Sequence, residues 1–293
     1  MKWIKKIFKI VALLFGAMVV FVIGFYIKSY YGSEARITKK YAVEIEDIDV
    51  TSDSAIVAEG ARMTAIKGCR DCHGNDLGGK IFTDDPLMGT LAAPNLTRGE
   101  GGLPASFKPK DWVRVLKHGL DSDSTSLWIM PSHKFAKLTE KDMNAIIAYC
   151  SQLPTIDRVF EEPRLGPLGR VLTDLNQIPL LPAEMIHHEE PLVREIKAEV
   201  SVVYGKYLAA SCTGCHQENL KGGKALTPGA PAPADISSTG HPGKWTEDQF
   251  IATLRTGKTP EGKLLDERYM PWPMTKSYTD LELRALKMYL ATM

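Results

Sequence analysis

The sequence predicts a mainly α-helical protein in which one N-terminal membrane-spanning helix precedes two copies of a small domain. Three observations carry this prediction. An uncharged apolar run occupies residues 10–27. The pentapeptide Cys-x-x-Cys-His occurs at residues 69–73 and again at 212–216. The segments around both pentapeptides also repeat, and their apolar residues recur at the three- and four-residue spacing of an α-helix.

The N-terminal run has the length of a membrane span. A helix rises about 1.5 Å per residue, so residues 10–27 cover roughly the thickness of a hydrocarbon core. Signal peptides have shorter apolar stretches followed by a small-x-small cleavage site, and this run ends in Tyr26, Ile27 and Lys28. We therefore expect an uncleaved anchor over residues 10–28, with a cleaved leader as the alternative. Lysines flank both ends, so charge gives only a slight preference for a cytoplasmic N-terminus.

Composition and charge limit the classes of partner that the protein could bind. The chain has 293 residues, 24% of them charged, and a formal net charge of +1, which argues against nucleic-acid binding. The charge is uneven, because residues 1–40 hold eight basic residues and one acid, which leaves residues 41–293 with a net charge of −6. Such an acidic body would suit a basic partner, although it would equally serve solubility.

The two pentapeptides indicate covalent attachment of two haem c groups. In this chemistry the thiols of each pair add to the two vinyl groups of a haem, and the following histidine binds the iron. A redox dithiol or half of a zinc site would use the same cysteine spacing, but no βαβ pattern surrounds either copy. The predicted attachment residues are Cys69, Cys72, Cys212 and Cys215, with His73 and His216 as iron ligands.

Both halves repeat on either side of the pentapeptides. A short helical pattern precedes each one, a Gly-rich segment follows it, and a middle helix and a last helix come next. The last helices begin with Thr139 and Thr279, each followed by acidic residues, which is typical of a helix N-terminus. The repeating pairs of segments are 58–63 with 203–208, 75–80 with 218–224, 110–119 with 247–257, and 138–150 with 278–289.

A Met-Pro pair precedes the last helix by the same distance in each half and predicts the second iron ligand. Met130 and Met270 lie eight residues before the segments that begin the last helices. A thioether is a soft ligand, and His/Met ligation raises the reduction potential of haem. Met274 competes with Met270, and His133 competes with Met130, but neither competitor repeats in the other half. Core filling is the ordinary role of a methionine.

The remaining histidines and the fifth cysteine receive simpler expectations. Cys150 lies in the apolar run 145–150, so we expect a small buried hydrophobe and not a reactive thiol. We expect surface or loop positions for four further histidines and for His133, which leaves bis-histidine ligation disfavoured. These four are His118, His187, His188 and His241.

With these motifs, each half resembles the class I cytochromes c, over residues 53–153 and 195–293. The resemblance implies that the first and last helices of each domain cross and that haem fills the core. It also implies that a proline carbonyl of the loop orients the ligand histidine, with Pro94 and Pro233 as candidates. The tandem is similar to the membrane-bound cytochrome c subunits of bacterial alcohol dehydrogenases, which have three such units.

The resemblance also implies a topology, because c-type haem is attached outside the cytoplasm. Residues 1–9 then form a cytoplasmic tip, and residues 29–52 form a polar stalk above the inner membrane of a bacterium. Both haem domains lie on the periplasmic side. The Pro-rich linker 154–194 joins them, and its apolar part is expected to pack along the domains.

The expected function is single-electron transfer, not catalysis. Donors and acceptors would be redox proteins such as a dehydrogenase, a terminal oxidase or a soluble cytochrome. One alternative is a dihaem cytochrome c peroxidase, which needs an iron that opens to peroxide, whereas this chain offers a Met-Pro pair to each haem. Another alternative is a subunit that anchors and wires a periplasmic dehydrogenase.

Overall fold

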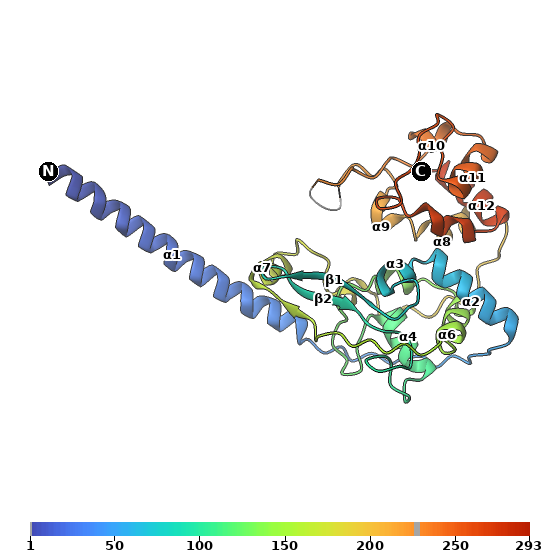
Figure 1. The fold of residues 1–293 in the computed structure, drawn as a ribbon, viewed down its shortest axis with the longest axis horizontal. Helices are drawn as coiled ribbons and strands as arrows, with labels where there is room; N and C mark the ends of the chain where they lie inside the picture. Colours follow the sequence, from blue (N-terminus) through green and yellow to red (C-terminus); the bar gives the residue numbers. More distant parts are fainter. Residues whose placement is uncertain (1, 226–228) are drawn as a thin grey trace.

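The structure is a computed structural model that describes residues 2–225 and 229–293. One long helix, α1 (Lys2–Ile37), projects from a body of two helical domains (Figure 1). Its most apolar 18-residue window has a mean hydropathy of 2.8, and the helix is long and apolar enough to cross a membrane. The mainly helical architecture predicted from the sequence is therefore confirmed.

The first domain is built on the crossing of its first and last helices. These are α2 (Ser54–Ile66), capped by the Asp53 carboxylate, and α6 (Glu140–Cys150). Gly60 allows the close approach, because a Cβ there would lie 1.9 Å from the Ala145 carbonyl oxygen. The other helices of this domain are α3 (Cys69–His73), α4 (Pro109–His118) and α5 (Ser132–Phe135).

The second domain repeats this crossing. Helix α8 (Val202–Ala209) packs against α12 (Asp280–Leu290), and a Cβ at Gly205 would lie 2.0 Å from the Ala285 carbonyl oxygen. Thr279 caps α12 as Thr139 caps α6, so the predicted starts of both last helices are confirmed. The remaining helices are α9 (Thr213–His216), α10 (His241–Lys244), α11 (Glu247–Thr256) and the 3-10 helix η2 (Trp272–Ser277).

A small antiparallel sheet was not expected from the helical patterns. Strands β1 (Lys80–Asp85) and β2 (Gly89–Ala93) form a hairpin, and β3 (Arg164–Leu165) pairs with β2. The linker supplies β3 together with α7 (Pro167–Asp174) and the 3-10 helix η1 (Pro182–Met185). The linker thus packs on the first domain, with Leu180 and Leu181 both buried.

The segment expected to be a stalk differs in the structure. Helix α1 continues to Ile37, well beyond the uncharged run, and α7 packs against this outer part. Residues 38–52 follow as extended chain along the first domain, where Ile48 is buried. Polar residues of this segment gain partners there, since Glu46 pairs with Lys117 and with His118. The segment is therefore part of the body.

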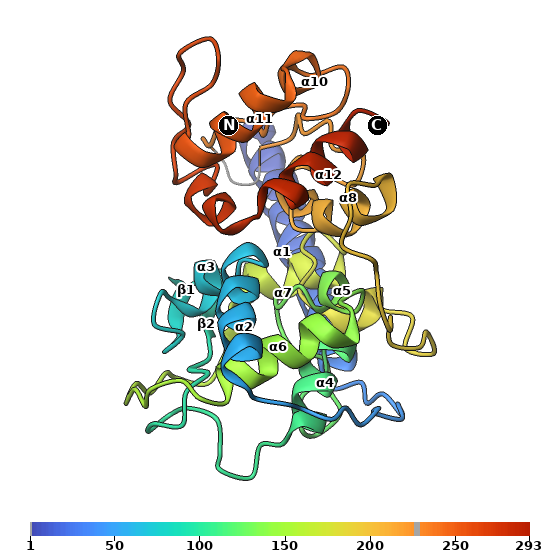
Figure 2. The same ribbon diagram turned by 90° about the vertical axis from the view of Figure 1, so that its right-hand side faces the viewer.

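The two domains share one hydrophobic core cluster. Figure 2 shows the second domain stacked on the first, with α8 and α12 facing α2. The cluster runs from Met63 and Ile66 of α2 to Leu283 and Leu286 of α12. Because buried apolar surface is continuous across the contact, the two domains are held in a defined arrangement.

Candidate functional site

Each attachment pentapeptide forms a short helical turn directly after the first helix of its domain. In the first domain Gly68, with φ of 74°, separates α2 from the turn α3. A left-handed residue at this place lets the chain reverse sharply, which favours glycine. The four cysteines are partly buried, whereas His73 and His216 are only 5% and 7% exposed. The histidine rings therefore point into the domains.

A backbone carbonyl holds each of these rings. The Nδ1 atom of His73 lies 2.9 Å from the Pro94 oxygen, and the Nδ1 atom of His216 lies 2.7 Å from the Ala234 oxygen. A carbonyl only accepts, so Nδ1 carries the proton and Nε2 keeps a lone pair for a metal ion. Burial lowers the pKa of both histidines, and the two hydrogen bonds oppose that shift. Burial therefore favours the neutral imidazole, and the hydrogen bond fixes its orientation.

The orienting carbonyl in the second domain belongs to Ala234, which corrects the expectation for Pro233. The backbone amides of Leu96 and Ile236 make matching hydrogen bonds of 2.9 Å, so these two residues are equivalent. Counting back two residues from each gives Pro94 and Ala234. The bond uses a main-chain oxygen, and alanine supplies it as well as proline. The equivalence of Leu96 and Ile236 could be read from the sequence, but the proline present in both segments pointed to position 233 instead of 234.

The two Met-Pro pairs adopt the same backbone turn. Pro131 has φ and ψ of −78° and 49°, and Pro271 has −73° and 59°. These angles lie near an inverse γ-turn. Accordingly, the Met130 oxygen accepts a hydrogen bond from the amide two residues on at 2.8 Å, and the Met270 oxygen accepts the equivalent bond at 2.6 Å. Both methionine side chains are partly buried against the shared core.

The competing ligand candidates lie after these turns. His133 belongs to α5, and Met274 belongs to η2. Each occupies a helical turn of its own domain without a counterpart of the same type in the other. Among these four candidates, Met130 and Met270 share both the residue type and the backbone turn, so the repeated geometry favours them as iron ligands.

Two tryptophans with buried indole N–H groups fit a group that carries carboxylates. The indole Nε1–H groups of Trp112, in α4, and Trp272, in η2, are buried and have no hydrogen-bond partner among the described residues. A buried donor without a partner is costly, and an indole N–H only donates. The two propionates of a haem are acceptors of the required kind. Together with the attachment cysteines and the oriented histidines, these donors fit one haem in each domain.

One histidine corrects the expectation of surface or loop positions. His118 is fully buried, with its Nδ1 atom 3.1 Å from Nδ1 of His188 and its Nε2 atom 3.1 Å from Glu46. Burial lowers the pKa of His118 to about 4, so its imidazole is neutral at pH 7. This cluster fastens residues 38–52 to the first domain. His187 and His241 are exposed, as expected.

The fifth cysteine confirms its predicted role. Cys150 ends α6 with 3% of its surface exposed and belongs to the core cluster. Burial raises the pKa of its thiol, which disfavours the reactive thiolate. Cys150 is therefore a packing residue.

Comparison with known families divides the chain at the same place as the structure. The sequence model of the family described as "Cytochrome c" matches residues 202–293. The model described as "Cytochrome C oxidase, cbb3-type, subunit III" matches residues 55–150. Each matched region begins in the first helix of one domain and includes its attachment pentapeptide and its Met-Pro turn.

Two curated relatives resemble most of the chain at low identity. Both are described as "Alcohol dehydrogenase (quinone), cytochrome c subunit", one from Gluconacetobacter polyoxogenes and one from Komagataeibacter europaeus. Each is 22% identical over 279 residues, which covers 83% of this chain and 57% of the relative. The chain thus spans little more than half the length of these relatives.

Proposed function

The chain carries two cytochrome c domains in tandem, each with a haem c attachment sequence, and from this premise we propose that it passes single electrons between redox proteins at the outer face of a bacterial inner membrane. The donor is a membrane or periplasmic protein, and the acceptor is a terminal oxidase or a soluble cytochrome. The observation that carries the proposal is the pair of equivalent Met-Pro turns. They offer each haem a second protein ligand and thus two closed sites.

Haem supplies one-electron chemistry when it is bound. In this proposal Cys69, Cys72, Cys212 and Cys215 hold the two haems covalently. His73 with Met130 would hold the iron of one haem, and His216 with Met270 would hold the iron of the other. The buried histidines keep their geometry through hydrogen bonds from Nδ1 to main-chain carbonyls. A soft thioether ligand together with imidazole would favour reduced iron and raise the reduction potential.

Closed sites distinguish an electron carrier from a dihaem peroxidase. A peroxidase needs one iron position that peroxide can enter. We therefore expect two six-coordinate haems, each with the weak near-infrared band of a sulfur–iron bond, and slow reaction with peroxide. Rapid two-electron turnover of peroxide at a five-coordinate haem would contradict the proposal. The measurement requires only oxidised and reduced spectra of the haem-loaded protein and a peroxide titration.

We also propose that α1 remains attached as a membrane anchor. Its outer part is built into the body: Lys28 pairs with Asp174 of α7 at 2.6 Å, and Arg170 pairs with Glu34 at 2.8 Å. Ser29, on the same part of α1, is fully buried. These contacts start one residue after the uncharged run, so α7 would lie at the membrane surface.

The anchor proposal has a direct test. Membranes washed with high salt should retain the haem protein, detergent should release it, and the N-terminal sequence of the released protein should begin before residue 10. A salt-soluble protein that begins after residue 28 would instead identify a cleaved leader. Protease added to intact spheroplasts should digest both domains if they face the periplasm.

A second candidate function is an anchoring and wiring subunit of a periplasmic dehydrogenase. It is favoured by the similarity to the cytochrome c subunits described above. Affinity purification of the detergent-solubilised full chain should then bring down a dehydrogenase in a fixed ratio. Recovery of an oxidase alone would favour the simple electron carrier.

A further inference from the structure

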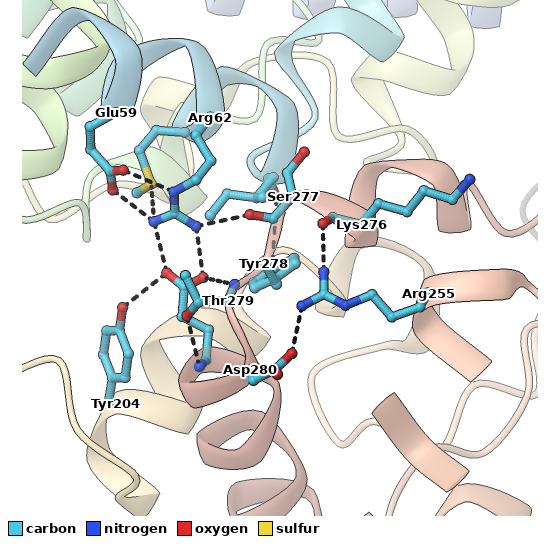
Figure 3. A network of polar contacts seen from close by, with 12 residues as sticks. Glu59, Arg62, Tyr204, Arg255, Lys276, Ser277, Tyr278, Thr279 and Asp280 are labelled. Atoms are coloured by element: carbon cyan, nitrogen blue, oxygen red, sulfur yellow. Dashed lines mark hydrogen bonds and ion pairs between the residues drawn. The ribbon is translucent and has the colours of Figure 1, made fainter. Parts of the chain in front are cut away.

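A network of polar contacts holds the two domains together beside the attachment turns. The Arg62 guanidinium, on α2, donates to both carboxylate oxygens of Glu282, on α12, at 2.7 and 2.9 Å. It also donates to the main-chain oxygen of Ser277 at 3.1 Å and to Glu59 of its own helix. Figure 3 shows Arg62 between Glu59 and Ser277. The Tyr204 hydroxyl donates to the Glu282 carboxylate at 3.1 Å.

The contact between the domains continues toward Cys69, the first cysteine of the first pentapeptide. The Tyr278 hydroxyl lies 3.5 Å from the Ile66 carbonyl oxygen, at the end of α2. In the other direction, Tyr207 of α8 places its hydroxyl against Thr139 and Asp142 at the start of α6. The end of α2 therefore lies against the second domain, three residues before Cys69.

Lys67 occupies this contact. It caps α2, and its ammonium lies 4.2 Å from the centre of the Tyr207 ring in the other domain. A cation over an aromatic face is attracted by the ring, which fixes the side chain across the interface. Asp142 and Glu282 face the ammonium from α6 and α12, and both oppose the lowering of the Lys67 pKa by burial.

The charge of Lys67 acts on both attachment turns. Burial raises the pKa of Cys69 to about 12 and that of Cys212 to about 11, and the lysine charge lowers both values. Lys67 precedes Cys69 by two residues, and its ammonium lies against Tyr207, five residues before Cys212. Both cysteines also pack against the shared core cluster to which Tyr207 belongs, so the ammonium lies between the two attachment turns. Once haem is attached, these sulfurs are thioethers at the edge of each porphyrin.

We propose that Lys67 places one positive charge beside both haem sites and thereby raises the reduction potentials of the two haems together. Reduction adds an electron to each site, and a nearby cation stabilises the added charge. Lys67 thus acts on the haems through its charge and does not bind iron. The proposal rests on the same two haems as the proposed electron transfer, but equilibrium potentials test it without any partner protein.

The test is a potentiometric titration of the haem-loaded, detergent-solubilised full chain at pH 6, where the ammonium form of the partly buried Lys67 is favoured. A unit charge at about 10 Å, through an effective dielectric constant of about 20, changes a one-electron equilibrium on the order of tenfold. Lys67→Met should therefore lower both potentials by about 59 mV each, which is a tenfold change for one electron. Lys67→Arg, which keeps the charge, should restore both.

The matched control is Lys206→Met, which removes an exposed lysine next to Tyr207 in the chain. It should leave both potentials unchanged. Lys67→Gln replaces Lys67→Met if the apolar variant loads haem incompletely. Unchanged potentials in the Lys67 variants, a shift of one haem alone, or an equal shift in the Lys206 variant would overturn the proposal. Absorption spectra report separately whether both haems stay six-coordinate.

Discussion

Arg62→Met tests the claim that the two domains are joined by a buried ion pair. Glu282 is 3% exposed, and methionine keeps the volume of the arginine stem while removing its charge. Among the described residues of its own domain, the carboxylate then retains Tyr204 and the Thr279 amide as hydrogen-bond partners, at 3.1 and 2.7 Å.

The expected cost follows from this burial. Removing one partner of a buried pair costs about 3–5 kcal/mol, because the other charge remains desolvated. The Arg62 side chain is 24% exposed, so we expect about 3 kcal/mol, at the lower end of that range. Adding Glu282→Gln should recover much of the loss, since a neutral amide replaces the unpaired charge.

The assay is urea unfolding of the haem-loaded full chain, followed by circular dichroism. Arg268→Met is the control, because Arg268 makes an ion pair of similar length, 2.6 Å, with Asp266 on the surface. That variant should unfold at the midpoint of the parent protein. Equal effects of the Arg62 and Arg268 variants, or no recovery in the double variant, would refute the reasoning.

Three further predictions concern the ligands, the helix crossing and pH. Met130→Ala and Met270→Ala should each remove the near-infrared sulfur–iron band of one haem; unchanged bands would exclude these ligands. Gly60→Ala should destabilise the first domain by about 1–3 kcal/mol through its clash with α6, whereas Gly214→Ala, with no atom within 4 Å, should be neutral in urea unfolding. Burial raises the pKa of Glu282, but Arg62 and the other hydrogen-bond partners of the carboxylate together lower it by more, so the folded pKa lies below the unfolded pKa of about 4.3. The stabilisation by this ion pair is therefore present above the unfolded pKa and is lost as pH falls through the folded pKa. Unfolding at pH 3–7 should show this loss, and Glu282→Gln should reduce it.

The attachment residues and most helices were predictable because their signals are local. Cys-x-x-Cys-His places two sulfurs and an imidazole on one turn, so sequence spacing already sets their relation. Cap residues such as Thr139 and Thr279 mark helix starts for the same reason. The methionine assignment needed the comparison of two halves, and the similar turns at Pro131 and Pro271 support it.

Other features depended on contacts between distant segments. The hairpin β1–β2 and its pairing with β3 involve residues whose periodicity is weak, and the linker strand has only two residues. The burial of His118 arises because residues 38–52 pack over it, which no pattern near His118 indicates. The indole N–H of Trp272 points to a bound acceptor only because it is buried without a partner among the described residues, and the sequence does not show that burial.

The sequence by itself determined the chemistry of this protein: a membrane-length apolar helix and two haem-attachment turns, each followed by a Met-Pro pair. These are properties of short contiguous segments, and their local geometry does not depend on the rest of the fold. Only the tertiary structure decided that Arg62 meets Glu282 and that Lys67 lies across the interface. Such pairs are separated by up to 220 positions in the chain, so packing of the two domains creates them and local sequence cannot specify them.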